Sequence, residues 1–328
     1  MKKITILALM VCAVLTVSPA FAQVKMTRAQ IIFNTSDWKG PRFPDGRPRL
    51  PDDLLQRAAA MTIEDIWDFL REHGYQNQFE GGWQALHADK PFAGRALTAQ
   101  YMPSRPDMAA AIAAEGRAEG RVGDTNSWPI NELQPGDVYV ADGFGKIISG
   151  TLIGSNLGNG IAAHTHAGFI FNAGIRDQEE NREIPNFNGL YRGYDPSDWA
   201  QMELTSINAP IRIGRAVVLP GDLVLVKPEE GVIFIPAILA EAAVSSAEFT
   251  ALKDAYNFEL NREGKNGAQF EGGWTPGKYE AFAKWIDAHP ELLKMPRTEF
   301  DAMLAEESHE SAEEKHPRPE ANAPGPRP

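Results

Sequence analysis

Apolar residues at helical spacing mark one helix near the start of the chain and three more further along. Four of them stand at positions i, i+3, i+4 and i+7: Ile63, Ile66, Trp67 and Leu70. Thr62 and Asp65 fit a capping box before this pattern and Gly74 ends it, so the pattern predicts an amphipathic helix. Similar patterns predict helices near residues 107–118, 246–260 and 279–288.

The middle of the chain carries the patterns of strands. The predicted strands are residues 92–102, 134–143, 167–177 and 219–236, of which the second and fourth open with a Pro-Gly-Asp turn. Such turns, followed by β-branched and aromatic residues, are typical of strands. Strands and helices mixed in this way predict an α/β core, and we place it at residues 90–244.

The first 22 residues have the pattern of a secretory signal peptide. Two lysines precede an uncharged run at residues 4–17, and Ala-Phe-Ala at 20–22 fits a cleavage site. The run is too short to span a bilayer. We therefore expect a periplasmic or secreted protein with no membrane anchor after cleavage. Cys12 is the only cysteine, so the mature chain would have no thiol to ligate a metal or act as a nucleophile.

The rest of the mature chain divides by composition. Residues 23–89 are predicted to be an N-terminal extension with the amphipathic helix, and residues 245–305 a helical C-terminal extension. In residues 306–328 Glu, Pro, Ala and Arg dominate without apolar periodicity, which predicts a disordered tail. The net charge is −12 and no block of Lys and Arg occurs, so we expect no nucleic-acid partner.

The hexapeptide QFEGGW occurs twice, at residues 78–83 and 269–274. Each copy follows a similar predicted helix, but the segments after the two copies differ, which argues against a duplicated domain. We interpret each copy as a helix end closed by Gly-Gly, with the Phe and Trp side chains packed beneath it.

Two segments are candidates for chemistry. Arg176 and Asp177 end a predicted strand, where ligands of α/β sheets usually bind. An arginine can grip a carboxylate and an aspartate can hold a hard divalent cation, although a surface ion pair is an equally good interpretation. Both side chains reach one cleft only if the chain leaves strand geometry, which Gly174 permits. The glycine-rich residues 150–160 suit a nest of backbone N–H groups for a carboxylate or phosphate, but match neither a Walker A nor a Rossmann motif.

Several motifs together resemble, in order and spacing, the RraA-like family. They are FAGRALT (92–98), QPGDVYVADG (134–143), GSNL (154–157), GIRD (174–177), LPGD (219–222) and GVIFIP (231–236). This family includes the 4-hydroxy-4-methyl-2-oxoglutarate aldolases, and its members are often labelled dimethylmenaquinone methyltransferases. The resemblance implies a swivelling β/β/α core, assembly as a homotrimer or a hexamer of two trimers, and active sites at subunit interfaces.

The resemblance also implies roles for single residues. Arg176 would hold the oxo acid, and Asp177 would ligate Mg²⁺ or Mn²⁺. The backbone amides of Asn156 and Leu157, which follow Gly154, would bind the pyruvate carboxylate. The aldolases have an acidic residue twenty intervening positions before their Arg-Asp pair.

This chain departs from the family pattern at that acidic position, which is Ser155. A serine hydroxyl can orient water, but it adds no negative charge and is not a comparable base. Asp142, at the end of a neighbouring strand, and Glu80 are the candidates to supply the missing carboxylate.

The residues and the resemblance support two functions. The first is an exported lyase that cleaves or decarboxylates a pyruvate-type oxo acid through an enolate stabilised by Mg²⁺ or Mn²⁺. The second is a relative without catalytic activity that binds a small carboxylate, because Ser155 replaces the acidic residue. Regulation of an RNA-degrading enzyme conflicts with the export signal, since such a partner is cytoplasmic.

Overall fold

The computed structural model describes residues 24–266 and 274–313. The predicted signal peptide, residues 269–273 of the second hexapeptide and residues 314–328 of the predicted tail lie outside the described residues. Within the described part, no helix is long and apolar enough to cross a membrane.

A mixed sheet of nine strands forms the centre of the described structure, in the order β1-β11-β10-β3-β4-β5-β6-β2, and β7 pairs with β3. The strands are β1 (Phe79–Glu80), β2 (Gln84–Ala85), β3 (Phe92–Pro103), β4 (Asp137–Asp142), β5 (Gly168–Ile175), β6 (Asn188–Tyr194), β7 (Met202–Ile207), β10 (Leu223–Lys227) and β11 (Gly231–Ile235). Strands β3 to β6 run parallel, and the other pairings are antiparallel. A separate hairpin consists of β8 (Ile211–Ile213) and β9 (Ala216–Val218).

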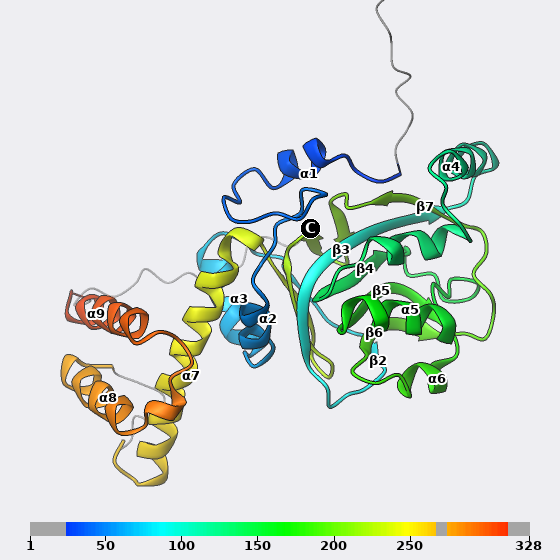
Figure 1. The fold of residues 1–328 in the computed structure, drawn as a ribbon. Helices are drawn as coiled ribbons and strands as arrows, with labels where there is room; N and C mark the ends of the chain where they lie inside the picture. Colours follow the sequence, from blue (N-terminus) through cyan, green and yellow to red (C-terminus); the bar gives the residue numbers. More distant parts are fainter. Residues whose placement is uncertain (1–23, 267–273, 314–328) are drawn as a thin grey trace, which may run out of the picture.

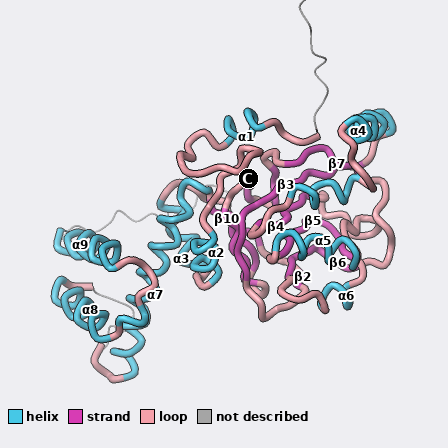
Figure 2. Tube along the Cα trace, in the orientation of Figure 1, coloured by secondary structure: helices cyan, strands magenta, loops and turns pink. Residues whose placement is uncertain are grey.

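Most of the helices lie in two groups beside this sheet: α5 and α6 in one, and α2, α3, α7, α8 and α9 in the other (Figures 1 and 2). The described helices are α1 (Arg28–Asn34), α2 (Asp52–Ala59), α3 (Ile63–Glu72), α4 (Pro106–Ala118), α5 (Ser155–Thr165), α6 (Gln178–Arg182), α7 (Ala240–Arg262), α8 (Pro276–Ala288) and α9 (Arg297–Glu313). Helices α5 and α6 connect parallel strands, which need crossovers of this kind. Helices α2, α3 and α7 pack against β10 and β11, and α8 and α9 project beyond α7.

Side chains of the parallel strands alternate between two buried faces. In β4, Tyr139 and Ala141 point to the face that α5 covers, while Val138 and Val140 point to the face that the β8–β9 hairpin covers. Because both faces are covered, these strands are apolar on both sides. Asp142 follows in the same alternation, so its side chain falls on the hairpin face.

The structure confirms most of the predicted elements. Strands β3, β4 and β5 and helices α3, α4, α7 and α8 lie where the patterns predict them. Thr62 caps α3: its hydroxyl accepts the Asp65 N–H at 3.2 Å and donates to the Asp65 carboxylate at 2.6 Å. The single strand predicted at residues 219–236 is instead two strands, β10 and β11, because a turn at residues 228–230 folds the segment into a hairpin.

Three predicted boundaries need correction. Residues 79–85, placed in the N-terminal extension, join the sheet, because β1 pairs with β11 and β2 pairs with β6. Helix α7 continues across the predicted end of the core at residue 244. The predicted tail begins too early, because α9 runs to Glu313. Alanine and glutamate favour a helix there, and Glu307 accepts hydrogen bonds from Lys253 and Tyr279.

Candidate functional site

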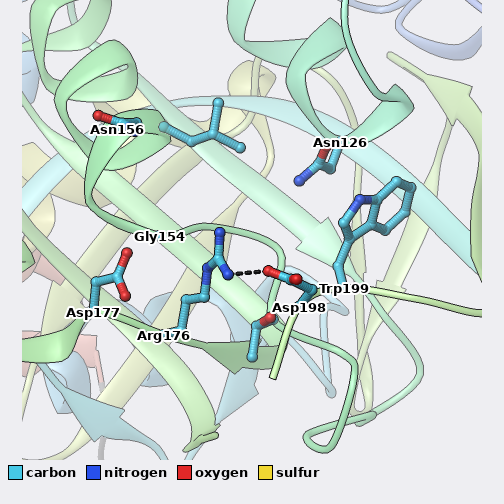
Figure 3. Close-up of a pocket in the computed structure, with 9 residues that line it drawn as sticks. Asn126, Gly154, Asn156, Arg176, Asp177, Asp198 and Trp199 are labelled. Atoms are coloured by element: carbon cyan, nitrogen blue, oxygen red, sulfur yellow. Dashed lines mark hydrogen bonds and ion pairs between the residues drawn. The ribbon is translucent and has the colours of Figure 1, made fainter. Parts of the chain in front are cut away.

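A small pocket lies beyond the carboxyl end of β5, on the face of the sheet that α5 covers (Figure 3). Its volume is about 80 Å³, which suits a ligand of only a few atoms. The lining residues are Asn126, Thr151, Gly154, Asn156, Leu157, Arg176, Asp177, Asp198 and Trp199. The pocket therefore brings together five of the residues that the sequence singles out, and Ser155 lies between two of them.

Arg176 and Asp177 share this pocket because the chain leaves strand geometry between them. Asp177 has a left-handed backbone with φ of 52°, so its side chain does not point to the opposite face as it would in a strand. Gly174 was expected to provide this freedom, but it stays within β5. A left-handed aspartate costs energy, and strain of this kind is concentrated at functional sites.

The glycine-rich segment forms the start of a helix rather than a loop. Helix α5 begins at Ser155, directly after Gly154. The Ser155 N–H donates to Asp177 Oδ2 at 3.0 Å, and its hydroxyl lies 3.4 Å from the same oxygen. The N–H groups of Asn156 and Leu157 are in the first turn, where a helix offers them no acceptor. The positive end of α5 therefore faces the pocket, and it favours an anion there.

Gly154 lets the helix approach the Arg-Asp pair this closely. A Cβ atom at this position would lie 2.4 Å from Asp177 Oδ2 and 2.9 Å from Arg176 Nε. Both distances are shorter than van der Waals contact, so a side chain would displace the residues of the site.

Arg176 is already paired with a carboxylate. Its guanidinium donates to Asp198, as the dashed line in Figure 3 shows. The Asp198 side chain is 79% exposed, so this ion pair is weak and a substrate carboxylate can replace it.

Three other pocket residues lie outside the sequence motifs. Asp198 and Trp199 follow β6 in an irregular loop, and Asn126 lies in the short helix η1 (Thr125–Glu132). Asn126 is buried and donates to the Leu152 carbonyl at 2.9 Å. None of these positions belongs to a periodic pattern, so only the folded chain places them beside Arg176.

The donor set suits a magnesium-type cation held mainly by water and substrate. Asp177 supplies a carboxylate, and Ser155 supplies a neutral hydroxyl. Among the described residues, no group of three or more His, Cys, Asp or Glu is arranged to hold a metal. Mg²⁺ keeps several waters and takes one or two protein carboxylates, whereas a zinc site needs three or four protein ligands. Asp177 and Ser155 would therefore be the protein ligands of a Mg²⁺ or Mn²⁺ ion in this pocket.

Within the chain, Asp142 and Glu80 do not reach this pocket. They belong to a row of polar side chains on the hairpin face of the sheet, which we call the polar row: Gln100, Asp142, Asn172, Arg192 and Glu80. Asp142 accepts from Gln100 at 2.9 Å and from Asn172 at 2.8 Å. Arg192 donates to Asn172 at 2.9 Å and to Glu80 at 3.0 Å. Strand alternation puts these carboxylates on the face opposite α5, so the prediction that Asp142 would replace the missing acid at Ser155 needs correction. The prediction for Glu80 concerns an active site at a subunit interface and stays a prediction.

The first hexapeptide completes the polar row. Arg192 donates to the carbonyl groups of Gly81 and Gly82, and its guanidinium lies 3.6 Å from the ring centroid of Trp83. The prediction that the first copy is a helix end closed by Gly-Gly is wrong, because α3 ends at Glu72 and the hexapeptide contributes strand β1. The segment instead holds one arginine by a carboxylate, two carbonyls and an aromatic ring. In the second copy only Trp274 is described, and it packs against Tyr256 and neighbouring rings.

These features define a mixed α/β protein with a small polar pocket where parallel strands end, facing a helix N-terminus. The sequence profile of the RraA-like family, described as Aldolase/RraA, matches residues 63–234, more than half of the chain. The chain therefore belongs to the RraA-like family, which includes aldolases and RNase E inhibitors. No curated protein sequence matches the chain significantly.

Solved structures agree with this assignment. RraAS2 of Streptomyces coelicolor, described as an unusual member of the RNase ES inhibitor RraA protein family, is 25% identical and superimposes with a TM-score of 0.54. The alignment covers 65% of this chain and all of RraAS2. An uncharacterised protein of Pseudomonas syringae pv. tomato has the same TM-score at 19% identity, with 69% of this chain and 95% of that protein covered, and shows the fold alone.

Proposed function

We propose that this protein is an exported, divalent-metal-dependent lyase that cleaves or decarboxylates a pyruvate-type oxo acid. The observation that carries the proposal is the convergence of Arg176, Asp177 and the first turn of α5 on one pocket. The volume of about 80 Å³ suits the three-carbon end of such a substrate.

The chain's own residues would bind and orient the substrate. The carboxylate of the oxo acid would accept hydrogen bonds from the N–H groups of Asn156 and Leu157. Arg176 would break its ion pair with Asp198 and bind the substrate instead. Asp177 would hold the cation, oriented by the hydrogen bond from the Ser155 N–H. A bound Mg²⁺ or Mn²⁺ supplies a Lewis acid for the negative charge that develops when the carbon–carbon bond breaks.

Metal-dependent release of pyruvate tests this proposal. The purified mature protein is incubated with oxaloacetate or 4-hydroxy-4-methyl-2-oxoglutarate, with Mg²⁺ or with a chelator, and pyruvate is followed with time. We expect release with Mg²⁺ that Arg176→Ala and Asp177→Ala each abolish. Equal release with Mg²⁺ and with chelator would contradict the proposal.

A carboxylate-binding protein without lyase activity is the second candidate, and one observation favours it. Asp177, the pocket aspartate beside Ser155, already accepts the Ser155 N–H, and Ser155 adds no second charge. Under this alternative, wild type binds pyruvate but releases none from either substrate, and Ser155→Asp creates metal-dependent release.

The assembly and the location of the protein are part of the same proposal. Family resemblance suggests a swivelling β/β/α core assembled as a trimer or hexamer, and the N-terminal pattern suggests export to the periplasm or beyond. Light scattering of the mature protein measures the assembly, and fractionation of cells that express the full chain measures the location. A monomer, or an uncleaved protein in the cytoplasm, would contradict the respective part.

A further inference from the structure

A second site lies at the edge of the sheet away from α5, and it shares no residue with the Arg176 pocket. Two adjoining cavities of about 400 and 300 Å³ have Gln76, Asn77 and Arg215 in common, and we call them together the extension groove. Each volume lies in the range of about 300–1,000 Å³ that is usual for small-molecule sites.

Five segments build the walls of the extension groove, and one of them is residues 63–67 at the start of α3. Residues 34–38 come from the end of α1 and the chain after it, and residues 74–79 follow α3. Residues 215–222 and 236–238 complete the walls. The first wall precedes residue 63, where the match to the RraA-like family begins. The groove therefore combines one wall from this chain's N-terminal extension with walls that lie mostly in the segment that matches the family.

The walls are held in place by hydrogen bonds. Arg42 donates to the carbonyl groups of Thr35 and Trp38, and the Trp38 indole N–H donates to the Pro41 carbonyl at 2.8 Å. On the opposite wall, the Gln78 side-chain amide donates to the carbonyl groups of Val217 and Phe234. A site built in advance in this way loses little conformational entropy when a ligand binds.

Aromatic rings and side-chain amides dominate the chemistry of the groove. Four half-buried aromatic side chains line it: Trp38, Trp67, Tyr75 and Phe79. Its amides come from the end of α1 and the loop after α3: Asn34, Gln76, Asn77 and Gln78. Gln78 already donates to two carbonyl groups of the wall and Gln76 pairs with Arg71, so Asn34 and Asn77 are the amides that face a ligand most directly. An amide both donates and accepts hydrogen bonds, as a sugar hydroxyl does, and the C–H face of a sugar ring packs on an aromatic surface.

The charges of the groove disfavour an anionic ligand. Arg215 is the only basic side chain on the described walls, and its guanidinium lies 4.0 Å from the Glu80 carboxylate. Asp37 and Glu64 add exposed acidic groups to the walls. A phosphate or carboxylate ligand would meet more negative than positive charge, whereas a neutral ligand needs no ion pair.

We infer that the extension groove binds a neutral oligosaccharide, with sugar rings against the aromatic side chains and hydroxyl groups on the amides. The two adjoining cavities give room for at least two sugar units along the groove. This inference is independent of the proposed lyase activity.

Titration calorimetry with the mature protein tests the inference. The probes are neutral tetrasaccharides of glucose, mannose, xylose and N-acetylglucosamine, and tetragalacturonate as an anionic counterpart. We expect at least one neutral probe to bind with a stoichiometry of one per chain, and tetragalacturonate to bind at least tenfold more weakly.

Two variants and one matched control locate the binding. Asn77→Ala, at an exposed groove position, should raise the Kd of the neutral probe at least tenfold, while Asn131→Ala, at an exposed position outside the groove, should leave it unchanged. Trp38→Phe, with the fold checked by circular dichroism, should raise the Kd severalfold. The inference is overturned if no neutral probe binds at millimolar concentration, if tetragalacturonate binds best, or if Asn77→Ala leaves the Kd unchanged.

Discussion

The two faces of the sheet hold acidic residues in opposite ways. On the α5 face, Asp177 and Asp198 lie at a pocket, and Arg176 meets only an exposed carboxylate that a ligand can replace. On the hairpin face, Glu80 and Arg192 are largely buried partners, with 17% and 19% of their side chains exposed. Open polar groups are available to a ligand, whereas groups that satisfy one another stabilise the fold. Position in the sequence does not distinguish these roles, but the face of the sheet does.

The largest effect is expected on the α5 face, whose polar groups are open to a ligand, at the arginine that would bind it. Arg176→Ala removes a bidentate hydrogen-bond donor for a carboxylate, which is worth about 3 kcal/mol, or about a hundredfold in the Kd for pyruvate. Calorimetry measures this affinity. Arg105→Ala is the matched control, because Arg105 is also an exposed arginine paired with an aspartate, and it lies outside the pocket. Equal affinities of the two variants would remove Arg176 from the site.

A smaller loss is expected from filling the space between α5 and Asp177. Gly154→Ala places a Cβ 2.4 Å from Asp177 Oδ2, so the free energy of unfolding should fall by about 2–3 kcal/mol. Urea denaturation measures it. Gly160→Ala in the same helix is the control, because the nearest atom to its Cβ would be 3.6 Å away. This control should gain stability, by about 0.5–1 kcal/mol. The close approach at residue 154 is unimportant if both variants behave alike.

Substitutions on the hairpin face, whose polar groups bind one another, should lower the stability of the fold and leave pyruvate binding unchanged. We call this face the closed face. Glu80→Gln leaves Arg192 without its charged partner, so the free energy of unfolding should fall by about 1–2 kcal/mol. The Kd for pyruvate, measured with and without Mg²⁺, should stay that of wild type. A change in the Mg²⁺-dependent part alone would show that Glu80 reaches a pocket in a neighbouring subunit, and would end the contrast between the two faces.

The smallest effect is expected at the other end of the polar row. Asp142→Asn keeps one acceptor but presents an amide N–H₂ to donors from Gln100 or Asn172, which should cost about 1 kcal/mol of unfolding free energy. Asp142→Ala, which removes both acceptors, serves as the comparison and should cost more. A loss of pyruvate affinity in Asp142→Asn without loss of stability would reverse the assignment of Asp142 to the closed face.

The sequence predicts those helices and strands whose formation depends on residues close together in the chain. The amphipathic pattern of α3 and the alternation of β3 to β5 depend on local spacing, and the structure confirms them. Arg176 and the glycine-rich segment come together because both stand where parallel strands end. Val138, Val140 and Asp142 alternate with the residues between them along β4, so all three side chains point to the hairpin face. The sequence alone therefore suffices to exclude Asp142 from the α5 face.

Other features depend on contacts that no local pattern encodes. Asp198 and Trp199 reach the pocket through an irregular loop, whose path depends on packing against distant residues such as Tyr101. Residues 79–85 resemble the end of a helix, yet strands from far along the chain recruit them into the sheet. The helix at residues 306–313 depends on partners on α7 and α8.

The ion pair between Arg176 and Asp198 makes ligand capture an exchange of one anion for another. The number of ion pairs is the same before and after a carboxylate enters, so dissolved salt weakens both states by similar amounts. The affinity of the pocket for a small acid should then vary little with ionic strength. The affinity of a solvated arginine without an ion-pair partner would fall as ionic strength rises. Under the proposed export, the protein would meet salt concentrations that its cell does not control, and this arrangement would keep the occupancy of its pocket steady across them.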